Sequence, residues 1–241
     1  MRLAISRLAA WAPGVDGDAA WNAWAEAPHE LGAEGAPDIS ALPALLRRRC
    51  NRLTRMMLHT AFAAAGTRVG TLRNVFASRH GVLNDTLPLI ELAARCERLS
   101  PMRFSHSVHN TQAGLFSLAA ENRAASSSLG ASESLFASAV LEGMTLLARR
   151  PKEAVLVVVG DEPPPALLAP WVDEPQTAFA VAFELERVPG DAPGLDLQLR
   201  PATGRVRRAW PDTLEFVRFW LRGESELVLA GDRHDAVFQR H

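Results

Sequence analysis

The 241 residues of the chain suffice for one large domain or two small ones, with a core that needs no disulfide or metal ion for stability. The formal net charge of −1 gives no case for nucleic-acid binding, and no apolar segment is long enough to span a membrane. The two cysteines, Cys50 and Cys96, lack metal-ligand spacing. They are expected to be buried and reduced, which is typical of a cytoplasmic protein.

The first third of the chain predicts a strand, a short helix, a loop and a long helix. Apolar residues indicate a strand over Leu3–Leu8, and Trp21 and Trp24 lie at helical spacing. A Gly-, Pro- and acid-rich segment follows and predicts an exposed loop. The expected bounds of the short helix, the loop and the long helix are Asp18–Glu26, Pro28–Asp38 and Leu42–Ala65.

The long helix has one strongly basic face. Arg47, Arg48 and Arg49 form a basic cluster, Arg52 and Arg55 follow a turn or two later, and apolar residues at helical spacing form the opposite face. This pattern is compatible with a solvated face. It is also compatible with a docking surface for an acidic partner, such as the acidic helix of another protein or a neighbouring subunit.

The middle of the chain continues the alternation of strands and helices. A strand is expected over Asn74–Ala77, followed by a helix over Thr86–Arg95 that Asn84 or Asp85 would cap. His106 and His109 have HxxH spacing, but no further ligand lies nearby, so no metal site is predicted. A helix over Thr111–Glu121 follows.

The segment from Ser126 to Leu147 predicts a strand, a tight turn and a buried helix. The strand covers Ser126–Gly130, and apolar residues recur at helical spacing from Leu135 onward. This order is typical of a nucleophile elbow, where backbone N–H groups at the helix N-terminus favour negative charge. The turn contains no cysteine, and Glu133 is the best candidate for the elbow position.

The last third predicts the clearest strand, Glu153–Val159, because its apolar run is typical of a strand buried on both faces. Two further strands are expected to be neighbours joined by a Pro/Gly turn, and a frayed tail is expected to contain His234 and His241. The alternation predicts an α/β fold with a mixed sheet covered on both sides. The other expected elements are strands Ala178–Glu186, Leu195–Leu199 and Glu226–Leu229 and helix Asp212–Leu221.

Several motifs resemble the N-terminal half of β-ketoacyl synthases. They are NTQAG at 110–114, LAAENR at 118–123, the strand and turn that follow, and Glu142 in the next helix. Further similar segments lie at 36–38, 76–81 and 104–110. The whole pattern resembles the short ketosynthase-like family of aryl polyene and xanthomonadin-type pigment gene clusters. The resemblance implies one half of a thiolase-like fold, truncated relative to full ketosynthases, in a single domain 1–241 with a ketosynthase-like core 1–165 and a divergent C-terminal region 166–241.

Two departures from a ketosynthase bear on activity. The position of the catalytic cysteine falls on Glu133, and the histidines that the second half of a ketosynthase supplies have no counterpart. Claisen condensation needs a thiolate to hold the acyl chain. The resemblance therefore implies a non-catalytic, chain-length-factor-like subunit without a cofactor. Its partners would be a full-length ketosynthase, in a heterodimer, and an acyl carrier protein bearing a phosphopantetheine-linked acyl chain.

The resemblance also implies roles for individual residues. Pairing with the ketosynthase would use the edge strand that contains Ser126, Ser127 and Ser128. The carrier protein would dock on the arginines of the basic face. Residues expected to line the acyl tunnel or the interface are Leu135, Phe136, Met144, His109 and Asn110.

Two enzymatic alternatives stay open. Gly130 to Ser134 differs from the Gly-x-Ser-x-Gly pattern only at its last position, so Ser132 would be the nucleophile of an esterase or acyltransferase, with His109 or His80 as base. Alternatively, Glu133 would serve a malonyl-carrier-protein decarboxylase, by analogy with ketosynthase-like domains that have Gln in place of the cysteine.

Overall fold

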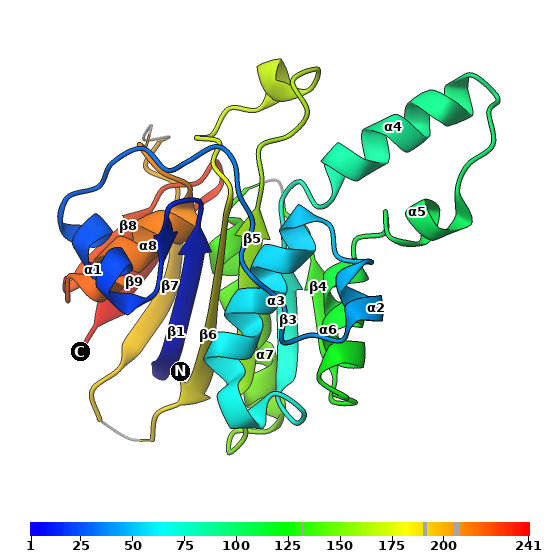
Figure 1. Cartoon of the computed structure of the whole chain (residues 1–241). Helices are drawn as coiled ribbons and strands as arrows, with labels where there is room; N and C mark the ends of the chain where they lie inside the picture. Colours follow the sequence, from blue (N-terminus) through cyan, green and yellow to red (C-terminus); the bar gives the residue numbers. More distant parts are fainter. Residues whose placement is uncertain (132, 190–191, 205–207) are drawn as a thin grey trace.

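A single mixed sheet of nine strands forms the centre of the computed structural model, which describes residues 1–131, 133–189, 192–204 and 208–241 (Figure 1). The strand order is β4-β3-β5-β6-β1-β7-β9-β8, and β2 pairs with β1 beside this path. The strands are β1 (Leu3–Ala12), β2 (Val15–Asp16), β3 (Arg73–Ala77), β4 (Ser126–Leu129), β5 (Val155–Asp161), β6 (Phe179–Arg187), β7 (Leu195–Pro201), β8 (Glu226–Leu229) and β9 (His234–Arg240).

The sheet has a parallel portion and an antiparallel portion. β3 pairs in parallel with β4 and β5, whereas the remaining neighbours are antiparallel. Every residue of β3 and β5 is buried, as expected for parallel strands with a helix layer on each face. β4 lies at one edge of the sheet and pairs only with β3 among the described strands.

Helices cover both faces of the sheet and define two apolar clusters. One cluster packs α1, α7 and α8 against the sheet, and the other packs α3 and α6 against the opposite face. α4 and α5 form an arm that projects from the body (Figure 1). The helices are α1 (Asp18–Glu26), α2 (Ala44–Arg47), α3 (Arg52–Ala65), η1 (Gly66–Arg68), α4 (Leu83–Ala94), α5 (Pro101–Ser105), α6 (Thr111–Ala119), α7 (Leu135–Arg149), η2 (Ala169–Trp171) and α8 (Asp212–Leu221).

The expected strand and helix between Ser126 and Leu147 are confirmed as β4 and α7. The expected strand at the N-terminus is also confirmed, and β1 extends it to Ala12. The single long helix predicted over Leu42–Ala65 is wrong, because the helical segment is interrupted between α2 and α3. Asn51 starts α3 as its N-cap, with a side-chain oxygen that accepts a hydrogen bond from the backbone N of Thr54 at 2.9 Å.

Four other expectations are wrong. Helix α4 begins at Leu83, before both of its predicted caps. β6 and β7 are not neighbours, because β1 lies between them. The C-terminal tail is not frayed: it forms β9, which pairs with β7 and β8. Cys96 is exposed, although Cys50 is buried as expected, and both are free thiols.

The described stretches of the chain contain no helix whose length and apolar character would let it cross a bilayer.

Candidate functional site at the strand-to-helix turn

The turn between β4 and α7 has strained backbone at its last residue. Ser134 is the N-cap of α7 and adopts a left-handed conformation, with φ 50° and ψ 40°. Its side chain makes no capping hydrogen bond. Left-handed backbone is uncommon for a residue other than Gly and is typical of functional turns. Among the described residues of this elbow, the strained position is therefore Ser134, one residue after the predicted Glu133.

Glu133 lies at the surface and contacts the C-terminal region of the chain. Its Oε2 accepts a hydrogen bond from the backbone N of Asp232 at 3.3 Å. The preceding Gly231 packs so closely that a Cβ there would lie 2.9 Å from Oγ of Ser134 and would clash with the carbonyl oxygen of His234. The turn between β8 and β9 thus packs directly against the elbow.

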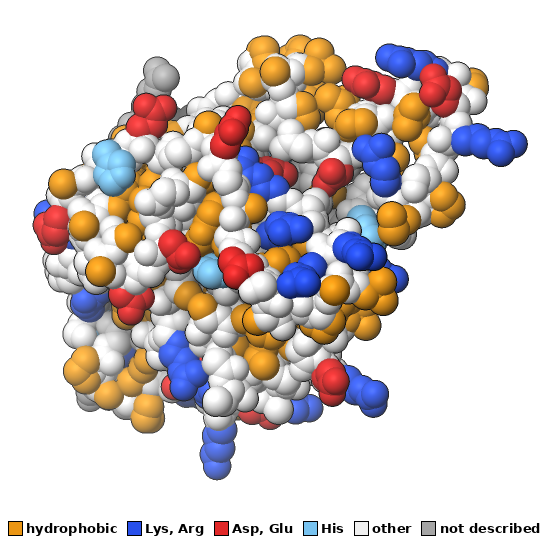
Figure 2. Space-filling model, viewed as in Figure 1, with side chains coloured by type: hydrophobic (Ala, Val, Ile, Leu, Met, Phe, Trp, Pro, Cys, Tyr) orange, Lys and Arg blue, Asp and Glu red, His pale blue; other side chains and the backbone are white. Residues whose placement is uncertain are grey.

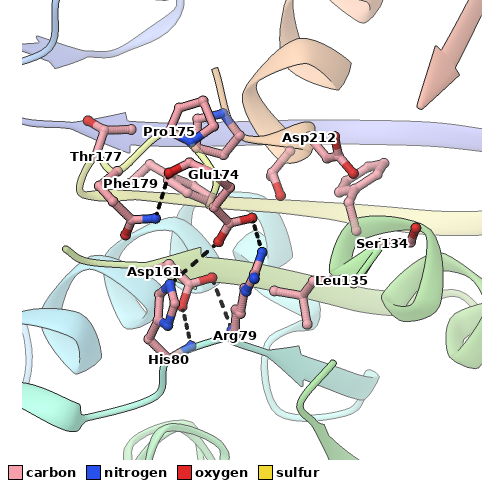
Figure 3. A pocket seen from close by; sticks show the side chains of 14 residues that line it. Arg79, His80, Ser134, Leu135, Asp161, Glu174, Pro175, Thr177, Phe179 and Asp212 are labelled. Atoms are coloured by element: carbon pink, nitrogen blue, oxygen red, sulfur yellow. Dashed lines mark hydrogen bonds and ion pairs between the residues drawn. The ribbon is translucent and has the colours of Figure 1, made fainter. Parts of the chain in front are cut away.

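Beside the elbow, Asp161 organises the loop that follows β3 (Figure 3). One of its carboxylate oxygens accepts hydrogen bonds from Ser78 Oγ at 2.7 Å and the backbone N of His80 at 3.0 Å, and the other accepts from the backbone N of Arg79 at 3.0 Å. Burial raises the pKa of Asp161 despite these three donors. Asp161 therefore fixes Arg79 and His80 at the carboxyl end of the parallel strands.

Arg79 and His80 hold Glu174, which comes from the loop between β5 and β6 (Figure 3). The Arg79 guanidinium forms an ion pair with Glu174, and Nε2 of His80 lies 3.4 Å from Oε1 of Glu174. These groups line a polar pocket together with Ser134, Leu135 and Asp212. Ion pairs lie along the wall of the pocket, and its described lining residues include no thiol.

Asp212 titrates in an unusual range within this pocket. Burial raises its pKa from 3.8 to about 6, and the carboxylates of Glu174 and Glu215 add to the shift, whereas Arg208 and Arg79 oppose it. Between these two pH values the folded state binds more protons than the unfolded state. The contribution of Asp212 to stability is therefore full below pH 4, falls as pH rises to about 6, and then stays constant.

The Asp212→Asn variant should lack this pH dependence. We expect the wild-type protein to lose about 2 kcal/mol of stability relative to the variant between pH 4 and pH 7. Urea unfolding of both proteins at half-unit pH steps measures the difference. A constant difference over this range would show that Asp212 has an ordinary pKa.

The predicted tunnel residues lie in different environments. Phe136 is fully buried in an aromatic cluster with Phe183, Phe216 and Phe238. Leu135 borders the polar pocket, and Met144 is half-buried against the core.

His109 and Asn110 are exposed at the start of α6. The His109 ring packs against the chain just after β4, because a Cβ on Gly130 would lie 3.3 Å from its Cε1. Both residues lie at the surface, and their role at an interface stays a prediction.

The serines of β4 differ in their contacts. Ser126 Oγ donates to Oδ1 of Asn74 at 2.5 Å, and Ser127 Oγ donates to Oε1 of Glu142 at 2.7 Å. Ser128 is exposed. These side-chain contacts attach the edge strand to β3 and α7.

The predicted basic face divides into two pairs of residues. Arg47 donates to the carbonyl oxygen of Ser40 at 2.9 Å, and Arg52 donates to the carbonyl oxygens of residues 33 and 35, at 2.8 Å each. Arg48 and Arg49 are exposed. The first pair therefore stabilises the preceding loop, and the second pair extends into solvent.

The enzymatic alternatives gain no support from the described geometry. Ser132 lies outside the described residues. The hollow that Glu133 lines contains Arg79, Glu174 and Asp212, but no histidine among its described lining residues. Across the described ranges, no three His, Cys, Asp or Glu side chains are grouped so that they could hold a metal ion.

Sequence reasoning missed the cluster of Asp161, Glu174 and Asp212. A carboxylate two residues after five consecutive buried valine and leucine residues was a usable signal for Asp161, because carboxyl ends of parallel strands face the ligand crevice. Glu174 and Asp212 gave no such signal, because they reach the pocket from loops and helix ends distant in the sequence.

Comparisons with known proteins identify the family. The model of the β-ketoacyl synthase N-terminal domain matches residues 21–238. No curated protein sequence matches the chain.

Among solved structures, a chain of the complex between a ketosynthase (ApeO) and its chain length factor (ApeC) from Xenorhabdus doucetiae is similar over 100% of both chains, with 27% identity and a TM-score of 0.87. The ishigamide ketosynthase/chain length factor has 14% identity and a TM-score of 0.65, over 84% of this chain and 68% of that one. A β-ketoacyl synthase from Burkholderia phymatum has 11% identity and a TM-score of 0.61, over 93% and 71%. The two more distant structures show the fold alone. The predicted fold class is confirmed, and the chain belongs to the β-ketoacyl synthase N-terminal domain family, with a thiolase-like fold that is truncated relative to full ketosynthases.

Proposed function

We propose that the chain is a non-catalytic, chain-length-factor-like subunit that pairs with a full-length ketosynthase in the biosynthesis of aryl polyene-type acyl chains. The observation that carries the proposal is an intact elbow without a thiol, placed directly after an open edge strand. The similarity to a complex of a ketosynthase with its chain length factor supports the choice of partner.

The elbow lacks the chemistry for condensation. No cysteine lies between β4 and the end of α7, and the two cysteines of the chain follow α2 and α4. A carboxylate at Glu133 is a weak nucleophile, and the anhydride that it would form with an acyl group is labile. The acyl chain would therefore be held by the cysteine of the partner.

The edge of β4 is suited to pairing with a strand of the ketosynthase. The carbonyl oxygens of Ala125 and Leu129 accept hydrogen bonds from β3 and the residue after it, at 3.0 and 3.1 Å. Because backbone groups alternate between the two sides of a strand, Ser127 also faces β3, whereas Ser126 and Ser128 direct their backbone N–H and C=O groups away from the sheet. These outward groups are available to a strand of another subunit.

The Ser128→Pro variant tests this pairing. Proline removes the outward N–H of Ser128 and leaves the hydrogen bonds to β3 in place, as edge strands tolerate. We expect affinity for the ketosynthase encoded beside this chain to fall at least about tenfold, measured by co-purification and titration of the purified subunits.

The matched control is Ser128→Ala, which keeps the N–H and should bind like the wild type. Circular dichroism checks that both variants fold. If Ser128→Pro binds as tightly as Ser128→Ala, the two subunits do not meet through this strand. If the wild-type chain does not bind the ketosynthase at micromolar concentration, the proposed function is wrong.

The acyl carrier protein is the second proposed partner. Figure 2 shows basic side chains gathered over the start of α3 and the turn before it, where every basic residue is an arginine. Arg48 and Arg49 are exposed there, and a carrier protein with an acidic helix would meet them.

We place the complex with the ketosynthase in the cytoplasm. Within this complex, Leu135 and Met144 of α7 are the residues that we propose to shape the acyl tunnel.

A further inference from the structure

Residues 163–172, in the loop between β5 and β6, form a stretch without a polar side chain, which we call the apolar loop. Their sequence is PPPALLAPWV. The loop projects beyond the ends of the two strands (Figure 1), and Figure 2 shows hydrophobic side chains gathered over it at the top of the view. Leu167 is 61% exposed, and Trp171, at 76%, is the most exposed large apolar side chain among the described residues.

The base of the apolar loop is fixed to the body of the protein. At its start, Asn84 donates to the carbonyl oxygen of Pro163 at 2.9 Å. Just after its end, Asp173 and Glu174 both form ion pairs with the guanidinium of Arg79, the first at 3.2 Å. The prolines fix φ at several positions between these anchors. The loop is therefore a preorganised projection that loses little further conformational entropy when it meets a surface.

The backbone of the apolar loop has few hydrogen-bond donors left for a partner. Four of its ten residues are prolines, which carry no N–H, so six N–H groups remain. The N–H groups of residues 168 and 169 donate to the carbonyl oxygen of Pro165, at 2.8 and 3.2 Å. Those of residues 171 and 172 donate to the carbonyl oxygens of residues 168 and 169, at 3.1 Å each. Such a segment is suited to an apolar medium, where every unpaired polar group is costly.

The apolar loop offers little to a protein partner. With roughly 100 to 200 Å² exposed by each of its two large exposed side chains, it presents about 300 Å² of apolar surface, well below the roughly 800 Å² that each partner buries in a stable complex. Protein interfaces also contain about one hydrogen bond per 100–200 Å², and no side chain of this loop can form one. A lipid bilayer needs no matched surface and no hydrogen bonds, and Trp side chains favour the boundary between its headgroups and acyl chains.

We propose that the apolar loop inserts shallowly into a lipid bilayer and holds the chain at the membrane as a peripheral protein. Leu167 and Trp171 enter the boundary between headgroups and acyl chains, while the anchored base stays outside. The loop contains no Lys or Arg, and acidic residues flank it on both sides. The attraction is therefore hydrophobic and does not require anionic lipids.

Flotation of the full chain with phosphatidylcholine vesicles tests the proposal. At about 1 mM lipid, we expect the wild-type chain to float with the vesicles and the Leu167→Asp, Trp171→Asp variant to float at least about fivefold less, because charged side chains are costly to insert. The matched control is Leu45→Asp with Leu118→Asp, which alters side chains that are 65% and 61% exposed on α2 and α6. This control should float like the wild type, and circular dichroism checks that both variants fold.

Fluorescence gives a second readout of the same contact. Lipids with brominated acyl chains quench tryptophans that enter the bilayer. The other five tryptophans of the chain are buried or half-buried in the body. We therefore expect these vesicles to quench the wild-type chain, and to quench the Trp171→Phe variant much less.

The apolar loop does not bind lipid if the wild-type chain fails to float, or if the loop variant floats like the wild type. Flotation that requires anionic phosphatidylglycerol and disappears at about 0.5 M NaCl would assign membrane binding to arginines elsewhere on the chain and contradict the proposal. Loss of flotation when the ketosynthase is bound would show that a protein covers the loop, and the bilayer would then not be its partner. Each of these results leaves the proposed function standing, because binding of the ketosynthase is measured separately.

Discussion

The Phe136→Ala variant is expected to unfold with a free energy about 3 to 5 kcal/mol lower than that of the wild-type protein. Phe136 is fully buried at the start of α7, and its ring centroid lies 4.4 Å from Phe216, 5.6 Å from Phe238 and 6.0 Å from Phe183. Truncation to alanine leaves a cavity between α7, α8 and the sheet, because close-packed neighbours relax only partly. Urea unfolding monitored by circular dichroism measures the loss.

Two matched substitutions separate packing from other effects of the change. Phe136→Leu keeps most of the apolar volume and should lose less than half as much stability. Phe104→Ala removes a phenylalanine that is 58% exposed, so it should change the stability of the free chain by less than about 1 kcal/mol. A loss below about 1 kcal/mol for Phe136→Ala would show that the ring borders open space, as the predicted tunnel requires, and not the core.

The Arg68→Met variant is expected to lose about 2 to 4 kcal/mol of folding free energy. Glu184 in β6 is fully buried, and Arg68 in η1 forms an ion pair with it and a second one with Glu186 at 3.0 Å. Removal of the arginine leaves the Glu184 carboxylate buried without its counter-charge, which costs more than the pair itself contributes. The Arg68 side chain is 41% exposed, so water partly replaces it and the expected loss is below that of a fully buried pair.

The double variant Arg68→Met with Glu184→Met removes both charges. It should recover most of the lost stability, because a buried ion pair can be replaced by apolar side chains of similar volume at little cost. Chemical unfolding of the two single variants and the double variant completes the cycle. Equal stabilities for Arg68→Met and the wild type would mean that the Glu184 carboxylate does not depend on Arg68 for the stabilisation of its charge.

Local sequence patterns predicted the elements around the elbow well. Apolar periodicity located α7, and the valine-rich run located β5, because both segments are buried in a regular pattern. The same periodicity concealed the break before α3, since Leu46, Cys50 and Leu53 remain in phase across it. Only the capping role of Asn51 marks the break.

Strand order and the composition of the site depended on tertiary contacts. Sequence proximity suggested that β6 and β7 are neighbours, and nothing local indicated that β1 inserts between them. The left-handed backbone lies at Ser134 and not at Glu133, the predicted elbow residue. Residue types alone do not specify this choice, because either residue would be strained in a left-handed conformation.

The position of β1 between two C-terminal strands has a consequence for how the protein folds. Leu3 pairs with both Arg187 and Leu195, so β1 cannot complete its pairing until strands more than 170 residues further along the chain have been made. Such a high contact order slows folding and leaves β1 and β5 as unpaired apolar edges in the nascent chain. Residues 1–165, the predicted ketosynthase-like core, should therefore be prone to aggregation when produced without residues 166–241.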